Sequence, residues 1–399
     1  MFNFLDNTDQ HKCLVPGYDI VVCGGGVAGL WLLNILTKAG FDVLLIEKES
    51  LGGYQTIASQ GMIHGGQRYL LGTNSSAHAE TVATLPSRWD ACLGGTGEVD
   101  LTGVHVLSET QFMWAVGGRL SQVALISGKF TLNAKTRKLD GDEVPRALYG
   151  MTTPHVIELP EKVLDVGSLI KALSDPHKDR IQKAEVEFLS RDGTLSVNGS
   201  KIKAQVVICA AGLGNEEYLT MLDAGLRTSQ RRPLRQFMVR SMPYALYGHG
   251  ITTSYKPRVT VTSHPLNSGG YVWYLGGSIA DDTLSLNDLD AIEFAKKEIN
   301  LIFDHLDWTG KQWSTWCCVR AEAYSHNGRL PNGPVVKEYG SVLVVWPTKL
   351  TLTPHLGDQV LARLSQKGIF PKPKETGTQA LELAPLPLAP YPWEQSEWS

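Results

Sequence analysis

A glycine-rich turn near the N-terminus constrains the fold of this chain more than any other feature. The run 24–29 reads GGGVAG, follows a short β-branched segment at 18–23 and precedes an apolar segment at 30–39. A second apolar run at 42–46 comes next and ends at Glu47. Strand, helix and strand in this order form a βαβ unit, which requires a parallel sheet covered by helices. The sequence therefore predicts an α/β protein with a Rossmann-like nucleotide-binding domain.

The spacing of the glycines in this turn suits a bound diphosphate. Gly24 permits the tight turn, Gly26 lets the backbone approach the phosphates, and Gly29 lets the helix pack closely against the strand. The helix N-terminus faces the phosphate charge. Glu47 lies about 20 residues after the first glycine, where a carboxylate can accept hydrogen bonds from a ribose diol. The unit predicts a dinucleotide site without distinguishing FAD from NAD.

Composition excludes several classes of protein. The 399 residues are 43% hydrophobic, which predicts a globular chain of two or three domains. The net charge of −3 and the dispersed basic residues disfavour a nucleic-acid binder. No apolar stretch reaches the roughly 18 residues of a membrane span, and the first 20 residues lack the apolar core of a signal peptide. Six cysteines without CxxC spacing fit neither a disulfide framework nor a zinc site. We expect a cytoplasmic protein without a metal site and, because no coiled coil is evident, a monomer.

Three further segments point to FAD. The loop 52–70 is rich in glycine and small polar residues and resembles the flavin-contacting loop and helix of the D-amino-acid-oxidase superfamily, the glutathione-reductase-2 structural group. Its residues 63–70 are most similar to FAD-dependent glycerol-3-phosphate dehydrogenases. The apolar run 204–211 and the following glycines resemble a second turn near the FAD in this superfamily. The turn 349–351, after a buried strand at 341–346, is similar to the lysine-containing turn of the glycerophosphate enzymes.

The resemblance covers residues 19 to about 367 in islands and implies a set of FAD contacts. In the family, the helix that follows Lys349 starts at the flavin pyrimidine, where its N-terminus and the lysine would stabilise the negative charge of the reduced flavin. We expect this helix to have Thr353 as N-cap and Pro354 at its first position. The predicted cofactor contacts are Gly24, Gly26, Val27, Ala28, Gly29, Glu47, Lys48, Gln55, Thr56, Ser59, Gln60, Gly61, Ala211, Gly212, Lys349, Leu350 and Thr351.

The remaining segments predict a second domain inserted into the first. Alternating segments at 236–240, 258–262 and 271–275 predict strands of a mixed β-sheet over the flavin, and 289–306 predicts a supporting helix. The predicted FAD-binding domain comprises residues 1–84, 154–232 and 325–370. The predicted substrate domain comprises residues 85–153 and 233–324. The proline-rich residues 371–399 show no packing pattern and predict an extended tail.

Five residues are candidates for the chemistry. Arg320 resembles the arginine that binds the substrate carboxylate in amino-acid oxidases such as glycine oxidase, and a guanidinium suits any small anion. Arg68 and Tyr69 match the glycerophosphate pattern as a second anion contact and a substrate-orienting hydroxyl. His64 is interpreted as a general base, a site of covalent flavin attachment or a structural histidine. Lys349 would act electrostatically at the flavin.

Three functions remain open at this point. The chain is interpreted first as an oxidoreductase that moves a hydride to FAD from a 2-amino acid, a 2-hydroxy acid or a phosphorylated polyol, with oxygen or a quinone as the electron acceptor. The alternatives are an FAD-binding protein without its own turnover and a flavin-dependent component of RNA modification. The arginine-rich segment 227–235 is the feature that would favour RNA, although we interpret it as the entry of an interdomain strand in preference to a nucleic-acid patch.

Overall fold

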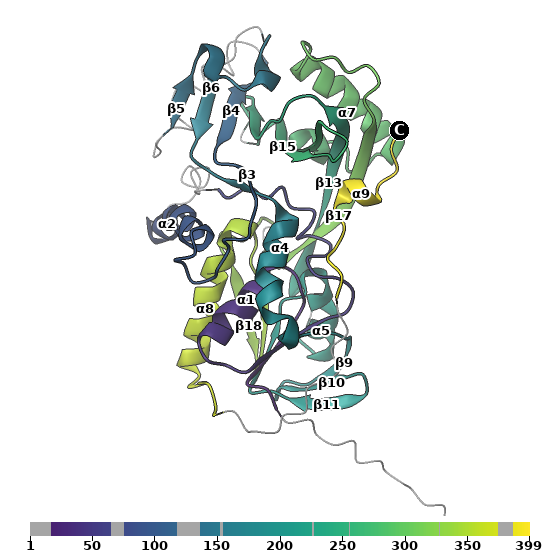
Figure 1. Cartoon of the computed structure of the whole chain (residues 1–399). Helices are drawn as coiled ribbons and strands as arrows, with labels where there is room; N and C mark the ends of the chain where they lie inside the picture. The colour runs from purple at the N-terminus through teal and green to yellow at the C-terminus, as the bar shows by residue number, and fades with distance from the viewer. Residues whose placement is uncertain are drawn as a thin grey trace, which may run out of the picture.

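The computed structural model describes residues 17–64, 76–117, 136–151, 155–225, 227–254, 256–326, 328–373 and 386–399. These residues form two lobes, one above the other in Figure 1, each built around its own large sheet. None of the helices in the described ranges is both long and apolar enough to cross a lipid bilayer.

The lower lobe is built on a six-stranded sheet with the order β18-β19-β12-β1-β2-β8. Five strands run parallel, and β18 pairs antiparallel with β19 at the edge. The strands are β1 (Ile20–Cys23), β2 (Val43–Glu47), β8 (Ile181–Lys183), β12 (Val206–Cys209), β18 (Val335–Tyr339) and β19 (Val342–Trp346). The apolar runs that the sequence places in β1, β2, β12 and β19 are buried on both faces, as parallel strands require.

Different elements pack on the two faces of this sheet. Helices pack on one face, around Ile20, Val22 and Leu45. They are α1 (Val27–Lys38), α2 (Ser76–Leu93), α4 (Val166–Ser174) and α8 (Thr353–Gln366). The other face, around Val21 and Leu44, packs against a smaller antiparallel sheet and α5 (Asn215–Met221). The smaller sheet comprises β9 (Val186–Leu189), β10 (Thr194–Val197) and β11 (Ser200–Lys203).

The upper lobe is an eight-stranded mixed sheet with the order β17-β13-β16-β15-β14-β4-β6-β5. Among the strands of this sheet in the described part of the chain, only β14 and β4 pair in parallel. The strands are β4 (Gln111–Ala115), β5 (Arg137–Leu139), β6 (Val156–Leu159), β13 (Ser229–Met242), β14 (Gly248–Ile251), β15 (Val259–Pro265), β16 (Tyr271–Gly276) and β17 (Trp313–Ala323). The predicted strand segments 236–240 and 271–275 lie within β13 and β16, which confirms them. The segment 258–262 is confirmed except for its first residue, because β15 begins at Val259. The mixed sheet predicted for the second domain is therefore present.

Short elements complete the two lobes. In the upper lobe, α6 (Ser278–Asp281) and α7 (Asp288–Ile302) pack on the sheet, and α7 confirms the predicted supporting helix. Between the lobes, β3 (Val106–Ser108) pairs with β7 (Val163–Leu164). The 3₁₀ turns are η1 (Gly141–Glu143), η2 (Arg146–Leu148), η3 (Asp175–Arg180), η4 (Gly212–Gly214) and η5 (Leu350–Leu352). The long strands β13 and β17 run side by side from one lobe to the other (Figure 1).

Two predicted domain boundaries differ from the packing. Trp89 and Cys92 on α2, with Val99, Leu101 and Val104 after it, belong to the core of the lower lobe although the prediction placed them in the substrate domain. Conversely, β6 belongs to the upper sheet although residues from 154 were assigned to the FAD-binding domain. No change in composition marks either domain boundary, because the hydrophobic pattern of a helix is the same whichever sheet the helix packs against.

The prediction of an unpacked tail is wrong for residues 386–399. Leu388 forms a parallel bridge with Leu51 in the lower lobe. The helix α9 (Pro392–Gln395) buries Trp393 against the upper sheet. The backbone of Ser399 exchanges hydrogen bonds of 2.9 and 2.8 Å with Trp313. Figure 1 shows this yellow segment across the strands β13 and β17 that join the lobes. Aromatic side chains, rather than hydrophobic periodicity, supply the packing that the sequence pattern did not reveal.

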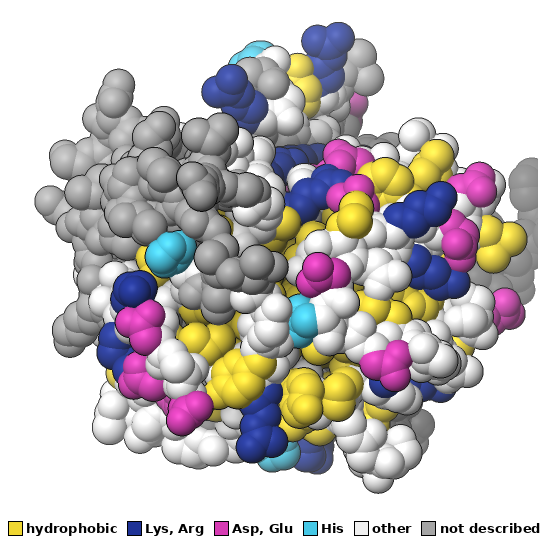
Figure 2. Space-filling model, turned by 90° about the horizontal axis from the view of Figure 1, so that it is seen from above, with side chains coloured by type: hydrophobic (Ala, Val, Ile, Leu, Met, Phe, Trp, Pro, Cys, Tyr) yellow, Lys and Arg dark blue, Asp and Glu magenta, His cyan; other side chains and the backbone are white. Residues whose placement is uncertain are grey.

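The arginine-rich segment lies along the edge of the strand pair β13 and β17 and is neutralised by carboxylates. Arg231 contacts Glu216, Arg232 Nη1 lies 3.4 Å from Glu322, and Arg235 Nη1 lies 2.8 Å from Asp288. On the face seen in Figure 2, basic and acidic side chains are interspersed. These contacts favour the interdomain-strand interpretation of this segment.

Candidate active site

A cavity of about 680 Å³ extends from the β1–α1 turn to the underside of the upper sheet. Its walls include the carboxyl ends of parallel strands, where open α/β sheets bind their ligands. The structure brings most of the predicted site residues together around it. Those on its walls are Gly24, Gly26, Val27, Ala28, Glu47, Lys48, Gln55, Thr56, Ser59, Gln60, His64, Ala211, Gly212, Arg320, Lys349, Leu350 and Thr351.

Two predicted cofactor contacts, Gly29 and Gly61, do not line this cavity. A Cβ on Gly29 would lie 1.9 Å from the carbonyl oxygen of Gly24, and one on Gly61 would lie 1.9 Å from that of Leu164. Both glycines permit a close approach of backbone to backbone. For Gly29 this is the packing role that the motif predicts, whereas Gly61 has a role in joining its loop to β7.

The β1–α1 turn presents its backbone to the cavity. Gly24 has a φ of 115°, in the region that favours glycine, and a Cβ there would lie 2.7 Å from the carbonyl oxygen of Ala210. Gly26 is the N-cap of α1 and contributes no side-chain cap. The Val27 amide donates to Thr56 Oγ1 at 3.2 Å. Because its N-cap glycine adds no side chain, this helix N-terminus at the cavity wall is a suitable cradle for the diphosphate of a dinucleotide.

Glu47 lies at the end of β2, beside this turn. Its Oε2 accepts a hydrogen bond from the Gly25 amide at 2.7 Å, and its Oε1 accepts one from the Glu49 amide at 2.9 Å. A carboxylate oxygen has a second lone pair, so both oxygens can still accept from ribose hydroxyls. Lys48 next to it is half-exposed and lies 3.9 Å from the carboxylates of Glu185 and Glu217. This wall fits the adenosine end of a dinucleotide.

The loop that continues from residue 52 connects the two lobes beside the cavity. Gln55 Oε1 accepts from the Ala321 amide on β17 at 3.1 Å. Gln60 Nε2 donates to the Tyr274 carbonyl on β16 at 3.0 Å. Both glutamines therefore hold strands of the upper sheet over the cavity. The predicted cofactor contacts thus have a second role in positioning the upper lobe.

A buried asparagine shapes the opposite wall. Asn215 Oδ1 accepts from the Ala211 amide at 3.0 Å, and its Nδ2 donates to the Val345 carbonyl at 3.0 Å. The side chain is fully buried and joins the ends of β12 and β19. It fixes the turn that contains Ala211 and Gly212. The glycines of this turn drew attention in the sequence, whereas the asparagine after them was not recognised as a site-shaping residue.

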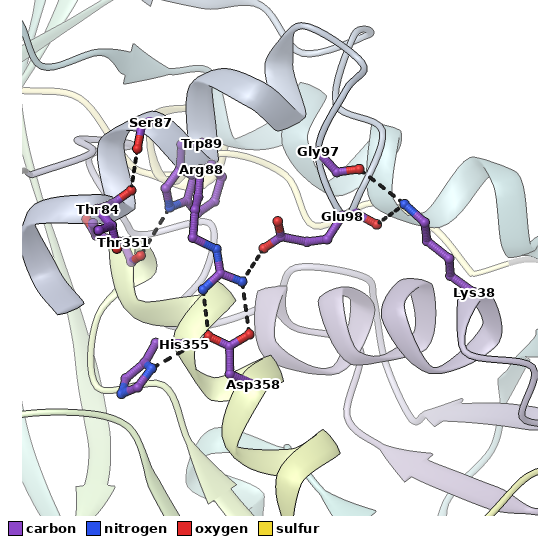
Figure 3. Close-up of polar contacts among 10 residues, drawn as sticks. All are labelled: Lys38, Thr84, Ser87, Arg88, Trp89, Gly97, Glu98, Thr351, His355 and Asp358. Atoms are coloured by element: carbon purple, nitrogen blue, oxygen red, sulfur yellow. Dashed lines mark hydrogen bonds and ion pairs between the residues drawn. The ribbon is translucent and has the colours of Figure 1, made fainter.

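The turn η5 and the start of α8 form the far end of the cavity. Thr351 Oγ1 accepts from the His64 amide at 3.1 Å, and its carbonyl accepts from Trp89 Nε1 at 3.1 Å. Figure 3 shows how Arg88 on α2 binds Asp358 on α8 through two hydrogen bonds of 2.6 and 3.0 Å. These contacts hold α2 against the turn. They position Thr351 without placing a charge in the cavity.

The predicted cap of α8 is displaced by one residue. Thr353 is the first helical residue, and Leu352 is the N-cap because η5 continues directly into the helix. Thr353 Oγ1 donates to the Leu350 carbonyl at 2.8 Å instead of accepting from a helix amide. Pro354 remains in the first turn, as its fixed φ allows.

Lys349 is partly buried beside the two arginines of the β13–β17 pair. Burial lowers the pKa of its ammonium from the ordinary value to about 7. Arg232 and Arg320 act in the same direction, and Glu322 opposes them. Each of these groups is thus sensitive to any charge that enters the cavity. An anion there would favour the protonated form of Lys349.

Arg320 on β17 lies directly opposite Arg232 on β13 in the antiparallel register. Burial lowers the pKa of the Arg320 guanidinium, and Arg232 adds to the effect. Its Nε is buried without a hydrogen-bond partner. Among the described residues, no carboxylate forms an ion pair with Arg320, whereas Arg232 lies 3.4 Å from Glu322. Like charges opposite each other are destabilising, so this wall provides a cationic site suited to an anion.

His64 reaches the cavity close to the side chains of Glu161 and His249. Its Nδ1 lies 3.5 Å from Oε2 of the buried Glu161. The rings of His64 and His249 are 5.6 Å apart, and His249 Nδ1 lies 3.0 Å from Thr260 Oγ1. The wall at this position therefore contains two imidazoles, and the carboxylate of Glu161 contacts one of them; all three groups can accept or hold a proton.

Sequence reasoning missed one residue that lines the cavity, His249, and two that contact or face its lining residues. Glu161, Arg232 and His249 were not predicted as site residues, and no motif marks them, because each enters the site by strand pairing with a distant segment. Arg68 and Tyr69 lie outside the described residues. Within the described ranges, no cluster of three or more histidine, cysteine or acidic residues could hold a metal ion.

Family comparisons agree with this geometry. Residues 19–363 match the model of the DAO family, described as FAD dependent oxidoreductase. The chain belongs to this family of FAD-dependent oxidoreductases, and its cofactor is FAD. The glycine turn, the N-terminus of α1 and Glu47 fit the adenosine diphosphate part of FAD.

A relative with a known structure resembles this chain over nearly its whole length. The chain is 38% identical over 383 residues to the probable FAD-dependent oxidoreductase PA4991 of Pseudomonas aeruginosa, covering 94% of this chain and 97% of that protein. The crystal structure of PA4991 matches with a TM-score of 0.82 over 96% of this chain and 98% of that one, at 36% identity.

Two more distant structures share the fold. They are glycine oxidase from Geobacillus kaustophilus, with a TM-score of 0.62 at 17% identity, and FAD-bound L-alpha-glycerophosphate oxidase from Mycoplasma pneumoniae, with 0.63 at 16%. The matches cover 93% and 92% of this chain and 98% and 100% of the other chains, respectively.

Proposed function

We propose that this oxidoreductase removes a hydride from a small anionic substrate that Arg320 holds in the cavity. The observation that carries the proposal is the state of Arg320. Its guanidinium lies at the cavity wall, faces Arg232 across the strand pair and has no carboxylate partner among the described residues. A partly buried cation of this kind is stabilised when an anion binds, and its planar fork suits a carboxylate or a phosphate.

The charges around this position support an anion over a neutral substrate. Arg232, Arg320 and Lys349 are the basic groups of the cluster, and Glu322 is the acidic group that acts on all of them. Asp281 acts more weakly, on Arg320. Glu322 is almost fully buried and bound to Arg232, so it offsets one of the positive charges. The remaining positive charge favours a ligand with at least one negative charge.

Each residue then has a separate task. Bound FAD supplies the hydride acceptor. Arg320 fixes the anionic group of the substrate, which orients the neighbouring carbon that carries a hydroxyl or amino group. Lys349, at the turn before α8, contributes positive charge near the flavin end of the cavity. His64 or a water molecule accepts the proton that leaves with the hydride.

We propose a 2-amino acid, a 2-hydroxy acid or a phosphorylated polyol as the substrate class. All three present an anion beside an oxidisable C–H bond. Glycine oxidase and L-alpha-glycerophosphate oxidase, both related in fold, are named for members of this group. The acceptor of the electrons would be oxygen or a quinone. Formation of hydrogen peroxide during turnover would indicate oxygen, whereas reduction of a quinone-like dye would indicate a quinone.

We also propose that the protein acts in the cytoplasm as a monomer. The cysteines among the described residues are free thiols, and three of them are buried, which is typical of a reducing compartment. Sedimentation of the FAD-loaded protein would test the monomer, and localisation of a fluorescent fusion would test the compartment.

Anaerobic bleaching of the flavin tests the main proposal. The FAD-loaded protein is mixed with glycine, D-alanine, D-lactate or glycerol 3-phosphate, and we expect one class of anion to bleach the flavin absorbance. Arg320→Ala should then raise the concentration needed for half-maximal bleaching by roughly 100-fold, because a charged hydrogen-bonded contact is lost. Arg137→Ala is the matched control, because Arg137 is exposed on β5.

Two outcomes would contradict the proposal. If a substrate bleaches the flavin equally well in wild type and Arg320→Ala, Arg320 does not hold the anion. If anions only perturb the flavin spectrum and none of these classes bleaches it, the chain binds anions without this turnover. Salt-sensitive tRNA binding by the FAD-loaded protein would instead favour the RNA-modification alternative.

A further inference from the structure

Strand pairing places a buried glutamate opposite His64. Met62 and Val163 form an antiparallel bridge. The Ile63 amide donates to the Lys162 carbonyl at 2.9 Å, and the Leu164 amide donates to the Gly61 carbonyl at 2.9 Å. In an antiparallel pair, each step forward on one strand is a step back on the other. The position opposite His64 is therefore Glu161, in agreement with the 3.5 Å between His64 Nδ1 and Glu161 Oε2.

The two side chains of this pair differ in exposure. The side chain of Glu161 is 7% exposed and that of His64 is 31% exposed, so the carboxylate lies behind the imidazole as seen from solvent. The backbone of His64 is also fixed on its other side, because its amide donates to Thr351 Oγ1. With Nδ1 turned toward Glu161, the other ring nitrogen, Nε2, is the one left for a ligand in the cavity.

We propose that Glu161 is a positioning residue that holds His64 as the Nδ1–H tautomer, with Nε2 presented to the substrate as the proton acceptor. This inference rests on the proposed function and deepens it, since it selects His64 over water. The carboxylate accepts the Nδ1 proton, which leaves the lone pair of a neutral imidazole on Nε2. In turnover, the substrate O–H or N–H bond breaks and its proton passes to Nε2. The neighbouring C–H bond breaks at the same time and its electron pair leaves with the hydride to FAD, so that a C=O or C=N bond forms.

The other groups that face His64 are compatible with this assignment. His249 on β14 packs beside the His64 ring, and its Nδ1 is paired with Thr260 Oγ1 across the β14–β15 ladder. Thr351 contributes a hydroxyl from η5. Lys162, next to Glu161, contacts Asp90 at 3.2 Å and Glu109 at 2.7 Å. The lysine charge is therefore engaged by other carboxylates, and Glu161 is the carboxylate paired with His64.

Nitrogen NMR of the FAD-loaded protein tests the tautomer without a substrate. Selective ¹⁵N labelling of histidine distinguishes Nδ1–H from Nε2–H, and His64→Gln identifies the resonances of His64. We expect the Nδ1–H form in wild type and a shift toward the Nε2–H form in Glu161→Leu, which has no acceptor. Glu161→Gln retains an acceptor and should keep the wild-type tautomer. If the leucine variant does not fold, the glutamine variant and wild type still test the predicted tautomer. Glu109→Gln is the matched control and should leave the His64 resonances unchanged.

A double-mutant cycle tests whether Glu161 acts through His64. With the substrate found by anaerobic bleaching, Glu161→Leu should lower the limiting rate of flavin reduction by on the order of 10- to 100-fold. The half-saturating substrate concentration should change less than about twofold. In a His64→Ala background, the same substitution should have no further effect on that rate. A purely structural role would instead lower FAD retention and slow reduction in both backgrounds.

Distinct results overturn the two proposals. A wild-type His64 in the Nε2–H form, or an additive double mutant, would refute the role of Glu161 and leave the substrate assignment intact. Flavin that stays attached to acid-precipitated protein through His64 would refute it as well, because the imidazole would be alkylated. Failure of all anions to bleach the flavin would refute the proposed function, whereas the tautomer measurement would still stand.

Discussion

Replacing Lys349 by methionine is expected to stabilise the FAD-free protein at neutral pH and to lose that effect in alkali. Burial lowers the pKa of this lysine to about 7. In the unfolded chain the lysine has a pKa of about 10.4. Between these values the unfolded state binds one proton more than the folded state, so stability rises with pH. Methionine keeps an apolar chain of similar length and removes the titrating group.

The magnitude follows from the two pKa values. The folded state disfavours the ammonium by on the order of 4 to 5 kcal/mol near pH 6, and by less than about 1 kcal/mol near pH 10. At about pH 6, the free energy of unfolding of Lys349→Met should therefore exceed that of wild type by up to about 4 to 5 kcal/mol. The difference should shrink by about 1.4 kcal/mol for each pH unit between roughly pH 8 and pH 10.

Urea unfolding of the FAD-free protein, followed by tryptophan fluorescence across this pH range, measures the difference. Lys201→Met is the matched control, because Lys201 is exposed on β11 of the same lobe and its replacement should add no pH-dependent difference. A constant difference between Lys349→Met and wild type over the whole range would refute the reasoning, because it would show that burial does not suppress the charge of Lys349.

Three further predictions concern the framework of the site and the packing around His264 beside Trp393. Gly29→Ala should abolish FAD retention, seen as colourless purified protein, because its Cβ would lie 1.9 Å from the carbonyl oxygen of Gly24; a yellow variant of normal stability would contradict this. Trp89→Phe should lower the free energy of unfolding in urea by about 1 to 3 kcal/mol, because it leaves the buried Thr351 carbonyl without its donor; an unchanged midpoint would contradict it. Burial lowers the pKa of His264 to about 4, so the protein should lose about 3 kcal/mol as the pH falls from about 6.5 to 4. His264→Phe should remove that part of the acid sensitivity, and an identical acid denaturation profile would refute it.

The nucleotide half of the protein could be predicted from the sequence because its signals are local. The turn at Gly24 and the close packing at Gly29 depend on backbone geometry within one βαβ unit. The strands and helices around it follow from apolar runs and helical periodicity, both of which are read within a window of about 11 to 18 residues. The family resemblance added FAD, which the turn alone did not distinguish from NAD.

Other parts of the fold could not be predicted, for physical reasons. Residues 386–399 pack through Trp393 and through the backbone of Ser399, and neither produces a periodic pattern. The start of α8 shifted by one residue because η5 continues into the helix, a choice made by its packing and not by the capping preference of Thr353. The sequence did not predict that α2 packs in the core of the lower lobe, because the apolar face of a helix does not identify the sheet against which it packs.

By itself the sequence determined the nucleotide turn, the acid at the end of β2 and the presence of an arginine suited to anions, because residue type and spacing along the chain are sufficient for these. Only the tertiary structure decided that Arg320 faces Arg232 and that His64 faces Glu161. The register between strands that are distant in the chain depends on the packing of both lobes, and that register sets which charges meet in the cavity.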